Sequence, residues 1–160
     1  MFLCTAAFLK QWQIHGANRR MLNKSSNDPD KNMAETVVIL GASANPDRYS
    51  YKAQVALIEN GHIPVPVNPG YNQIDGIQCY PELKSVKCHI DTITVYVRPA
   101  ILRGMTEDII HARPRRVIFN PGAECREVSA RLEAAGIKVR NACTLVLLNT
   151  AQFDDLSSSY

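Results

Sequence analysis

The chain has 160 residues, 46% of them hydrophobic and 21% charged, the composition of one ordinary globular domain with a buried core. Residues 1–32 hold five Lys and Arg against two acids, while residues 33–160 hold thirteen of each, so the formal net charge of +3 arises in the first segment. A neutral body lacks the basic stripe that nucleic acid requires, which excludes nucleic acid as a partner. The five cysteines are scattered without CxxC spacing, which favours reduced thiols in a cytoplasmic protein. No apolar run approaches the roughly 20 residues of a membrane span, so we predict no membrane association.

Residues 1–32 are predicted to be a disordered or non-native leader. They end in the polar run "NKSSNDPDKN", which is typical of a linker, and Met33 follows it directly. We therefore expect the folded domain to occupy residues 33–160 and the leader to be dispensable.

From Met33 onward, β-rich runs alternate with amphipathic runs. Strands separated by crossover helices imply a parallel sheet with helices on both faces, a doubly wound three-layer α/β/α fold of about five strands. Continuous apolar strands agree with burial on both faces, and two prolines in the second strand require an edge or irregular position. The expected strands are 36–40, 62–70, 92–97, 115–120 and 137–141, and the expected helices are 50–61, 100–112 and 123–136.

Between the second and third strands, Asp75-Gly76 is a turn signal that predicts a short hairpin or an extended segment within residues 72–81. The run "PELKSV" that follows is expected to supply one or two helical turns.

The loop "GASANPDRYS", residues 41–50, leaves the first strand and opens the first helix. In an open parallel sheet, ligands sit outside the carboxyl ends of the strands, where unpaired helix amides and the helix dipole favour a phosphate. Gly41 permits a tight turn, Ser43 offers a hydroxyl and Ser50 is predicted as the helix N-cap. Taken alone, one glycine fits plain turn geometry equally well.

The usual dinucleotide fingerprint requires two further glycines and an acid at the end of the second strand to hold the ribose. Asn68 and Pro69 stand where that acid is expected, so NAD is disfavoured.

Five segments in chain order, "GASANPDRYSYKA", "VPVNPGYNQIDGIQCYPEL", "DTITVYVRP", "RRVIFNPGAE" and "ACTLVLL", resemble the small stand-alone CoA-binding proteins. That family has a Rossmann-like fold and is related to the CoA-binding domain of succinyl-CoA synthetase and of ADP-forming acyl-CoA synthetases. The resemblance covers residues 36–153 and implies a small-molecule nucleotide ligand, coenzyme A or an acyl-CoA.

The resemblance also implies which residues bind, at the ends of four successive strands. Pyrophosphate contacts are expected from Gly41, Ala42 and Ser43, in a turn shaped by Asn45, Tyr49, Ser50 and Tyr51. The adenosine shelf is expected from Val67, Asn68 and Pro69, and the adenine or pantetheine side from Tyr96, Val97 and Arg98. Asn120, Pro121 and Glu124 are expected to close the pocket. Relatives often have a lysine shortly after "NPG" where this chain has Tyr71, which leaves Arg48 or Arg98 for the 3′-phosphate.

A catalytic site is not evident in the sequence. We interpret His15, His62, His89 and His111 as surface or boundary residues, and no nucleophile elbow, metal cluster or P-loop is present. Cys143 is the one reactive candidate, since a helix is expected to start beside it; the alternative, which we prefer, is a buried small hydrophobe. With an oxidant to take up two electrons, a reactive Cys143 would form a mixed disulfide with the CoA thiol.

Three hypotheses remain open at this level: a CoA-binding module without chemistry, an enzyme, and an interaction protein that has lost its ligand. The enzyme would be an NAD(P)-dependent oxidoreductase or a subunit of a CoA ligase. Whether the domain forms a homodimer is also open.

Overall fold

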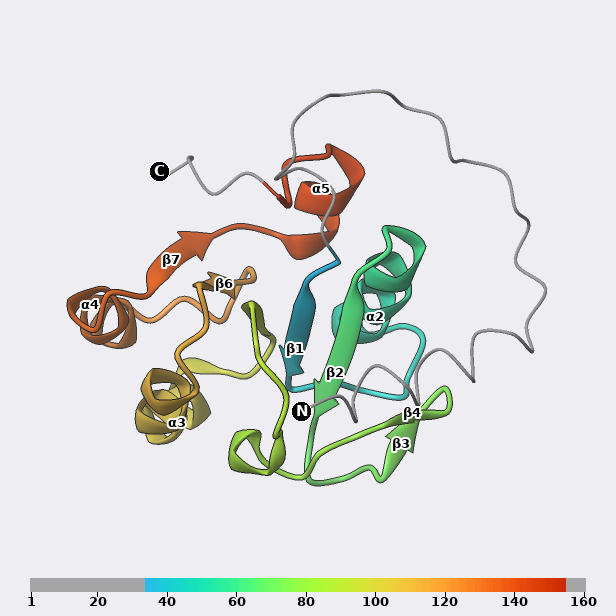
Figure 1. Cartoon of the computed structure of the whole chain (residues 1–160), viewed down its shortest axis with the longest axis horizontal. Coiled ribbons are helices and arrows are strands. Elements are labelled where there is room, and N and C mark those ends of the chain that lie inside the picture. Colours follow the sequence, from blue (N-terminus) through green and yellow to red (C-terminus); the bar gives the residue numbers. More distant parts are fainter. Residues whose placement is uncertain (1–33, 155–160) are drawn as a thin grey trace. The chain divides into compact units, whose positions relative to one another are not determined.

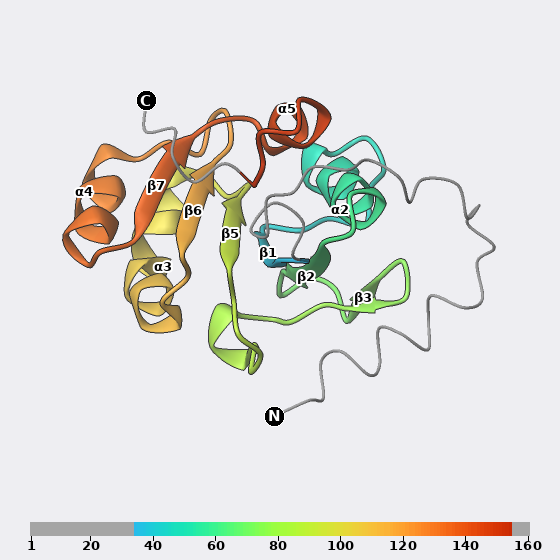
Figure 2. The same cartoon turned by 45° about the horizontal axis from the view of Figure 1, so that its top comes forward.

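The structure is a computed structural model that describes residues 34–154, so the predicted leader, His15 and Cys4 lie outside the described residues. Five parallel strands form one sheet (Figure 1), and their order is β2-β1-β5-β6-β7, as the labels in Figure 2 show. The predicted doubly wound, Rossmann-like α/β fold is confirmed. The strands are β1 (Thr36–Leu40), β2 (Ile63–Val67), β5 (Thr92–Val95), β6 (Arg116–Phe119) and β7 (Lys138–Asn141).

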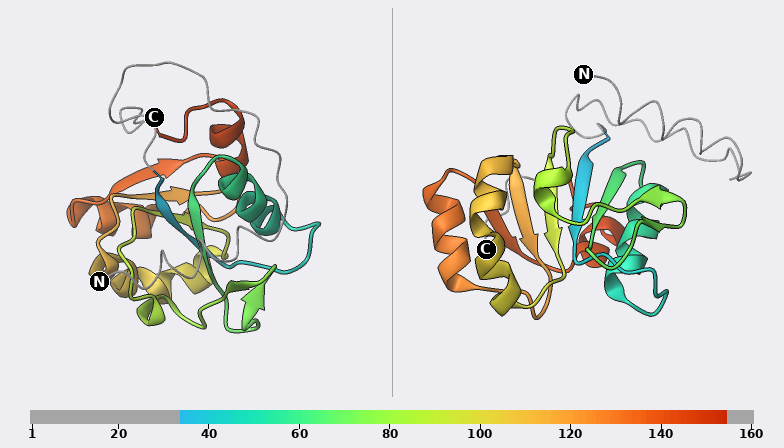
Figure 3. Two further views of the ribbon diagram at one scale, coloured as in Figure 1. Left: turned by 45° about the vertical axis from the view of Figure 1, so that its right-hand side comes forward. Right: turned by 90° about the horizontal axis from the view of Figure 1, so that it is seen from below.

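Two helices cover each face of the sheet. α2 (Tyr49–Glu59) packs against α5 (Thr144–Asn149) on one face, and α3 (Pro99–Ala112) packs against α4 (Arg126–Ala134) on the other (Figures 2 and 3). Side chains alternate along a strand, so β1 directs Val37 and Ile39 into the core beneath α2 and α5. Val38 and Leu40 of the same strand enter the core beneath α3 and α4. An uninterrupted apolar run is needed because both faces are covered.

The second strand lies at the edge of the sheet, as its prolines require. The backbone N–H and C=O groups of Ile63, Val65 and Val67 point toward β1. Those of Pro64 and Pro66 point away from the sheet, so the N–H groups that proline lacks break no hydrogen bond between strands. Tyr80 bridges to this outer edge, since its amide donates to the Pro66 carbonyl at 2.9 Å and its carbonyl accepts from the Asn68 amide at 2.9 Å. The edge prediction is confirmed.

The connection from β2 to β5 contains the predicted hairpin, formed by β3 (Gln73–Ile74) and β4 (Ile77–Gln78). Its turn residues Asp75 and Gly76 have φ of 49° and 76°, a left-handed conformation that suits this dipeptide. The predicted helical turn follows as the 3₁₀ helix η1 (Leu83–Ser85), which packs against α3.

Two predicted helix starts are wrong. α2 begins one residue early, with Arg48 in the N-cap position, so Ser50 is the second helical residue and not the cap. α4 begins at Arg126 and not at residue 123, because the preceding residues close a turn. In that turn the Ala123 amide donates to the Asn120 carbonyl at 2.9 Å, and the Gly122 amide donates to the Glu124 carboxylate at 2.7 Å.

Candidate ligand-binding site

The chain leaves the adjacent strands β1 and β5 toward opposite faces of the sheet, the arrangement at whose carboxyl ends open α/β sheets bind their ligands. Gly41 follows β1 with φ of 88° and lies against the residues that follow β5. A Cβ at position 41 would lie 2.8 Å from Val97 Cγ1 and 3.2 Å from the carbonyl carbon of Tyr96. Only glycine fits here, for reasons of both conformation and space.

The first two amides of the loop are already used within the protein. The amides of Gly41 and Ala42 both donate to the Val67 carbonyl, at 3.0 and 3.3 Å. Farther along, the Asn45 amide donates to the Ser43 hydroxyl at 3.1 Å, and the Asp47 amide donates to the Asn45 side chain at 2.9 Å. Gly41 and Ala42 therefore shape the loop, and their amides are not free to bind an anion.

Four other amides of residues 41–50 donate to no acceptor within residues 34–154: those of Ser43, Ala44, Tyr49 and Ser50. The last two are the first N–H groups of α2, which receives no side-chain cap. Such groups are where an anion gains both hydrogen bonds and the helix dipole. Arg48 and Tyr49 are exposed beside them.

Ser50 is the polar side chain that stands out at this helix start. It is only 5% exposed, and within the described residues its hydroxyl makes no hydrogen bond. Its oxygen is not one of the fully buried, unpartnered side-chain atoms of the described residues, so it keeps contact with solvent and is available to a ligand or to water.

Asn68 holds the loop from the end of β2. Its Nδ2 donates to the Ala42 carbonyl at 2.7 Å, and its Oδ1 accepts from the Gly70 amide at 2.8 Å. A carboxylate at this position could accept but not donate, which explains why an amide stands where a dinucleotide fold has an acid. The exposed Pro69 follows in the same turn.

Replacing Asn68 with aspartate is expected to lower the free energy of unfolding by about 1–3 kcal/mol, because a carboxylate would face the Ala42 carbonyl without a proton to share. The matched control is Asn60→Asp, since Asn60 Nδ2 donates to the Ala56 carbonyl at 2.8 Å in an exposed position. Urea unfolding at neutral pH measures both variants. Equal losses in the two would contradict the role of Asn68.

Asn120 is 3% exposed and fully engaged with protein groups. Its Nδ2 donates to Thr94 Oγ1 at 2.7 Å and to the Val95 carbonyl at 3.1 Å, and its Oδ1 accepts from the Thr144 amide at 2.9 Å. The hydroxyls of Thr94 and Thr144 also share a hydrogen bond of 2.7 Å. Asn120 thus ties the carboxyl ends of β5 and β6 to the start of α5, a network that sequence reasoning missed.

Tyr96 lies over this network. Its hydroxyl is buried and has no hydrogen bond of good geometry within the described residues. Burial raises the pKa of Tyr96 to about 12, against the opposing effect of the nearby Thr144 and Thr94 hydroxyls, so the phenol stays protonated. Cys143 is half-buried and α5 begins directly after it, as expected.

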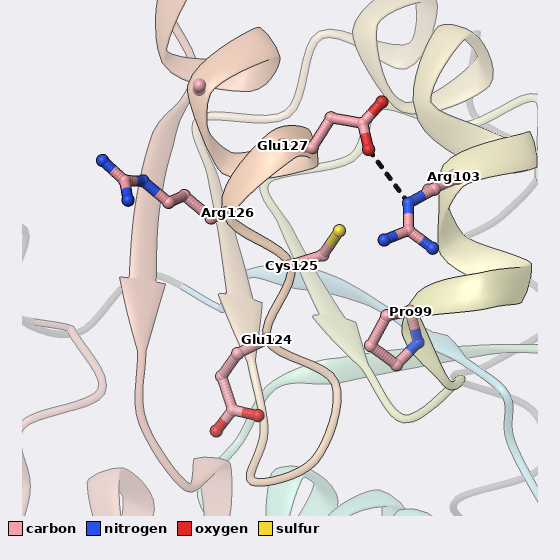
Figure 4. A pocket seen from close by; sticks show the side chains of 7 residues that line it. Pro99, Arg103, Glu124, Cys125, Arg126 and Glu127 are labelled. Carbon is pink, nitrogen blue, oxygen red and sulfur yellow. Dashed lines mark hydrogen bonds and ion pairs between the residues drawn. The ribbon is translucent and has the colours of Figure 1, made fainter.

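Glu124 borders a hollow of about 740 Å³ between the starts of α3 and α4. Figure 4 shows its lining, including Pro99 and Cys125, with an ion pair of 3.0 Å between Arg103 and Glu127 across one side. The hollow is not lined by residues of the 41–50 loop. Of the other predicted site residues, Pro121 is exposed, and Arg98 is exposed at the N-cap position of α3.

The interpretation of His62 as a surface or boundary residue is wrong, since it is 6% exposed. His89 is exposed and 3.3 Å from Asp91, and His111 is exposed. In residues 34–154 no group of three or more His, Cys, Asp or Glu side chains could hold a metal ion. None of the helices described is long and apolar enough to cross a bilayer.

A parallel α/β sheet with a glycine turn and open helix amides at its switch point defines the class of Rossmann-like α/β domains. More narrowly, the chain belongs to the CoA binding domain family, whose profile matches residues 35–149.

Individual relatives agree with this placement. A solved structure of an uncharacterized protein is 34% identical with a TM-score of 0.72, covering 76% of this chain and 100% of that one. The uncharacterized protein YneT of Bacillus subtilis is 29% identical over 77 residues, which are 48% of this chain and 57% of YneT. A dinucleotide forming acetyl-coenzyme A synthetase 1 of Ca. Korarchaeum cryptofilum shares the fold, with 19% identity, a TM-score of 0.61 and coverage of 73% of this chain and 28% of that one.

Proposed function

We propose that this domain binds coenzyme A or an acyl-CoA at the carboxyl edge of β1 and β5 and performs no chemistry of its own. The observation that carries the proposal is the start of α2, where the amides of Tyr49 and Ser50 have no acceptor and the Ser50 hydroxyl forms no hydrogen bond within the described residues. Family membership supports CoA as the ligand.

The distribution of donors suits a diphosphate. Ser43 and Ala44 offer amides near the start of the loop, and Tyr49 and Ser50 offer amides at its end, where α2 begins. Asn68 is turned inward to Ala42, so the end of β2 presents no carboxylate to a ribose diol. This supports a ligand recognised through its phosphates over NAD.

The two arginines predicted to contact the 3′-phosphate are both exposed, which supports this contact. Arg48 and Arg98 occupy the N-cap positions of α2 and α3, and neither forms an ion pair within the described residues. Either guanidinium supplies the charge that the 3′-phosphate of CoA requires, in place of the missing lysine.

Thermal unfolding with CoA, acetyl-CoA, NAD, NADP and ATP tests the proposal. At a hundredfold excess over its dissociation constant, a ligand that binds only the folded state stabilises it by about 2.7 kcal/mol. We expect a stabilisation of this size from CoA or acetyl-CoA. Ser50→Ala is expected to weaken CoA binding roughly tenfold, since a hydrogen bond to a charged group contributes about 1.5–3 kcal/mol.

The matched control is Ser129→Ala, which removes an exposed serine hydroxyl bonded to Glu133 on α4 and should leave CoA binding unchanged. Stabilisation by NADP but not by CoA would overturn the proposal in favour of an NADP-binding protein.

A further inference from the structure

A buried polar and aromatic cluster lies at the amino ends of the strands, opposite the candidate site. Its five members, each 6% exposed or less, are Glu35, His62, Thr92, Arg116 and Phe153. Phe153 belongs to residues 150–154, which follow α5 and which we call the C-terminal strap. The Phe153 ring lies 4.8 Å from the His62 ring, and the Arg116 guanidinium lies 4.5 Å above the Phe153 ring.

The strap is attached to α5 at one end and to His62 at the other. The Gln152 amide donates to the Leu147 carbonyl at 2.8 Å, and the Ala151 amide donates to the Leu148 carbonyl at 3.2 Å. At the far end, Asp154 Oδ1 lies 3.8 Å from His62 Nε2. Release of Phe153 would therefore free the carboxyl end of α5.

The hydrogen bonding of His62 fixes its protonation in the docked state. The Glu35 amide donates to His62 Nδ1 at 3.3 Å, so that nitrogen carries no proton and the ring is neutral. A proton on Nδ1 would remove this bond. The charged groups that face the ring are Glu35 before β1, Arg116 from β6 and Asp154 from the strap, with Arg115 3.3 Å from Glu35.

We propose that protonation of His62 releases the C-terminal strap, which makes residues 150–154 a pH-sensitive latch on α5. The other end of α5 borders the candidate site, since the Thr144 amide is bonded to Asn120 and its hydroxyl to Thr94. Opening of the latch weakens ligand binding there, and this second step rests on the proposed function.

The direction of the pH dependence follows from burial. Desolvation lowers the pKa of docked His62 below its ordinary value of 6.5, and Arg116 adds to this, while Asp154 and Glu35 oppose it. With the strap released, the ring is solvated and its pKa returns toward 6.5. The strap is therefore held at neutral pH, and below the ordinary value each unit of acidification favours the open form by up to about tenfold until the lowered pKa is reached.

Amide hydrogen exchange of the α5 and strap region, at about pH 8 and about pH 5.5 and corrected for intrinsic rates, tests the latch. We expect protection to fall by up to about tenfold at the acidic pH. His62→Asn, whose Oδ1 can still accept from Glu35, should lose this dependence. The matched control His89→Asn removes an imidazole that is 76% exposed and should retain it. Equal corrected protection at both pH values in the unmodified chain would overturn the proposal.

The Asp154→Asn variant tests the latch even where His62→Asn fails to fold. The Asp154 charge favours the protonated docked ring, so its removal should increase opening at the acidic pH and leave the neutral state unchanged. Reduced opening would overturn the latch.

CoA titrations of the unmodified chain and His62→Asn at both pH values test the second step. Weaker binding at acidic pH in the unmodified chain alone supports the coupling. Absence of CoA binding at every pH overturns the proposed function, while the exchange result still decides the latch.

Discussion

Replacing Gly41 with alanine is expected to abolish the CoA-dependent rise in melting temperature and to lower the free energy of unfolding by about 1–3 kcal/mol. The backbone has φ of +88° there, and the added Cβ would lie 2.8 Å from Val97 Cγ1 and 3.2 Å from the Val97 amide nitrogen. The loop must therefore move away from β5, which displaces the open amides that follow it. Isothermal titration with CoA and thermal unfolding measure the two effects.

Gly61→Ala separates conformational strain from contact. Gly61 has φ of +83°, but a Cβ there would meet nothing within 4 Å. This control should cost about 1–2 kcal/mol and leave CoA binding intact. Full CoA binding by Gly41→Ala would show that the ligand does not use this loop.

Replacing Arg116 with methionine is expected to destabilise the domain by roughly 3–5 kcal/mol, because the Glu35 carboxylate would remain buried without its main partner. Arg116 donates to Glu35 at 2.8 Å and to Thr92 Oγ1 at 2.8 Å, and both charged side chains are nearly inaccessible. Urea denaturation measures the loss. The double variant Glu35→Gln with Arg116→Met should recover part of the stability.

Arg131→Met is the matched control, since Arg131 pairs with Glu107 where both side chains are exposed. A surface pair contributes about 0–1 kcal/mol, so the control should lose little. A comparable loss in both arginine variants would indicate that burial of the Glu35 pair is unimportant.

The sheet was predictable because its signals are local. The apolar runs at β1, β5 and β6 and the amphipathic runs between them define strands and helices without knowledge of distant contacts. The prolines at 64 and 66 identified an edge strand for the same reason.

The pairing of polar residues was not predictable. Glu35 and Arg116 are 81 residues apart, and each stands at a strand boundary where a charged residue is usually solvated. Ser50 resembled a cap because serine often begins a helix, but the Arg48 carbonyl accepts the first helical bonds at 3.1 Å, which places the N-cap two residues earlier. Similarly, the turn closed by the Glu124 carboxylate makes α4 begin at Arg126, three residues later than predicted.

The CoA-binding interpretation depended on a family resemblance, since the loop alone is ambiguous. The family and the fold are confirmed. The individual contacts of Asn68, Asn120 and Tyr96 stay predictions, and the structure gives the first two clear partners within the protein.

The outer side of β2 is closed to further strands. Pro64 and Pro66 lack amide protons, and Tyr80 already occupies the Pro66 carbonyl and the Asn68 amide. A second molecule that approaches this border finds no ladder to extend, which protects against polymerisation by strand addition. Growth of the sheet across molecules would therefore have to begin at β7, the strand at the opposite edge.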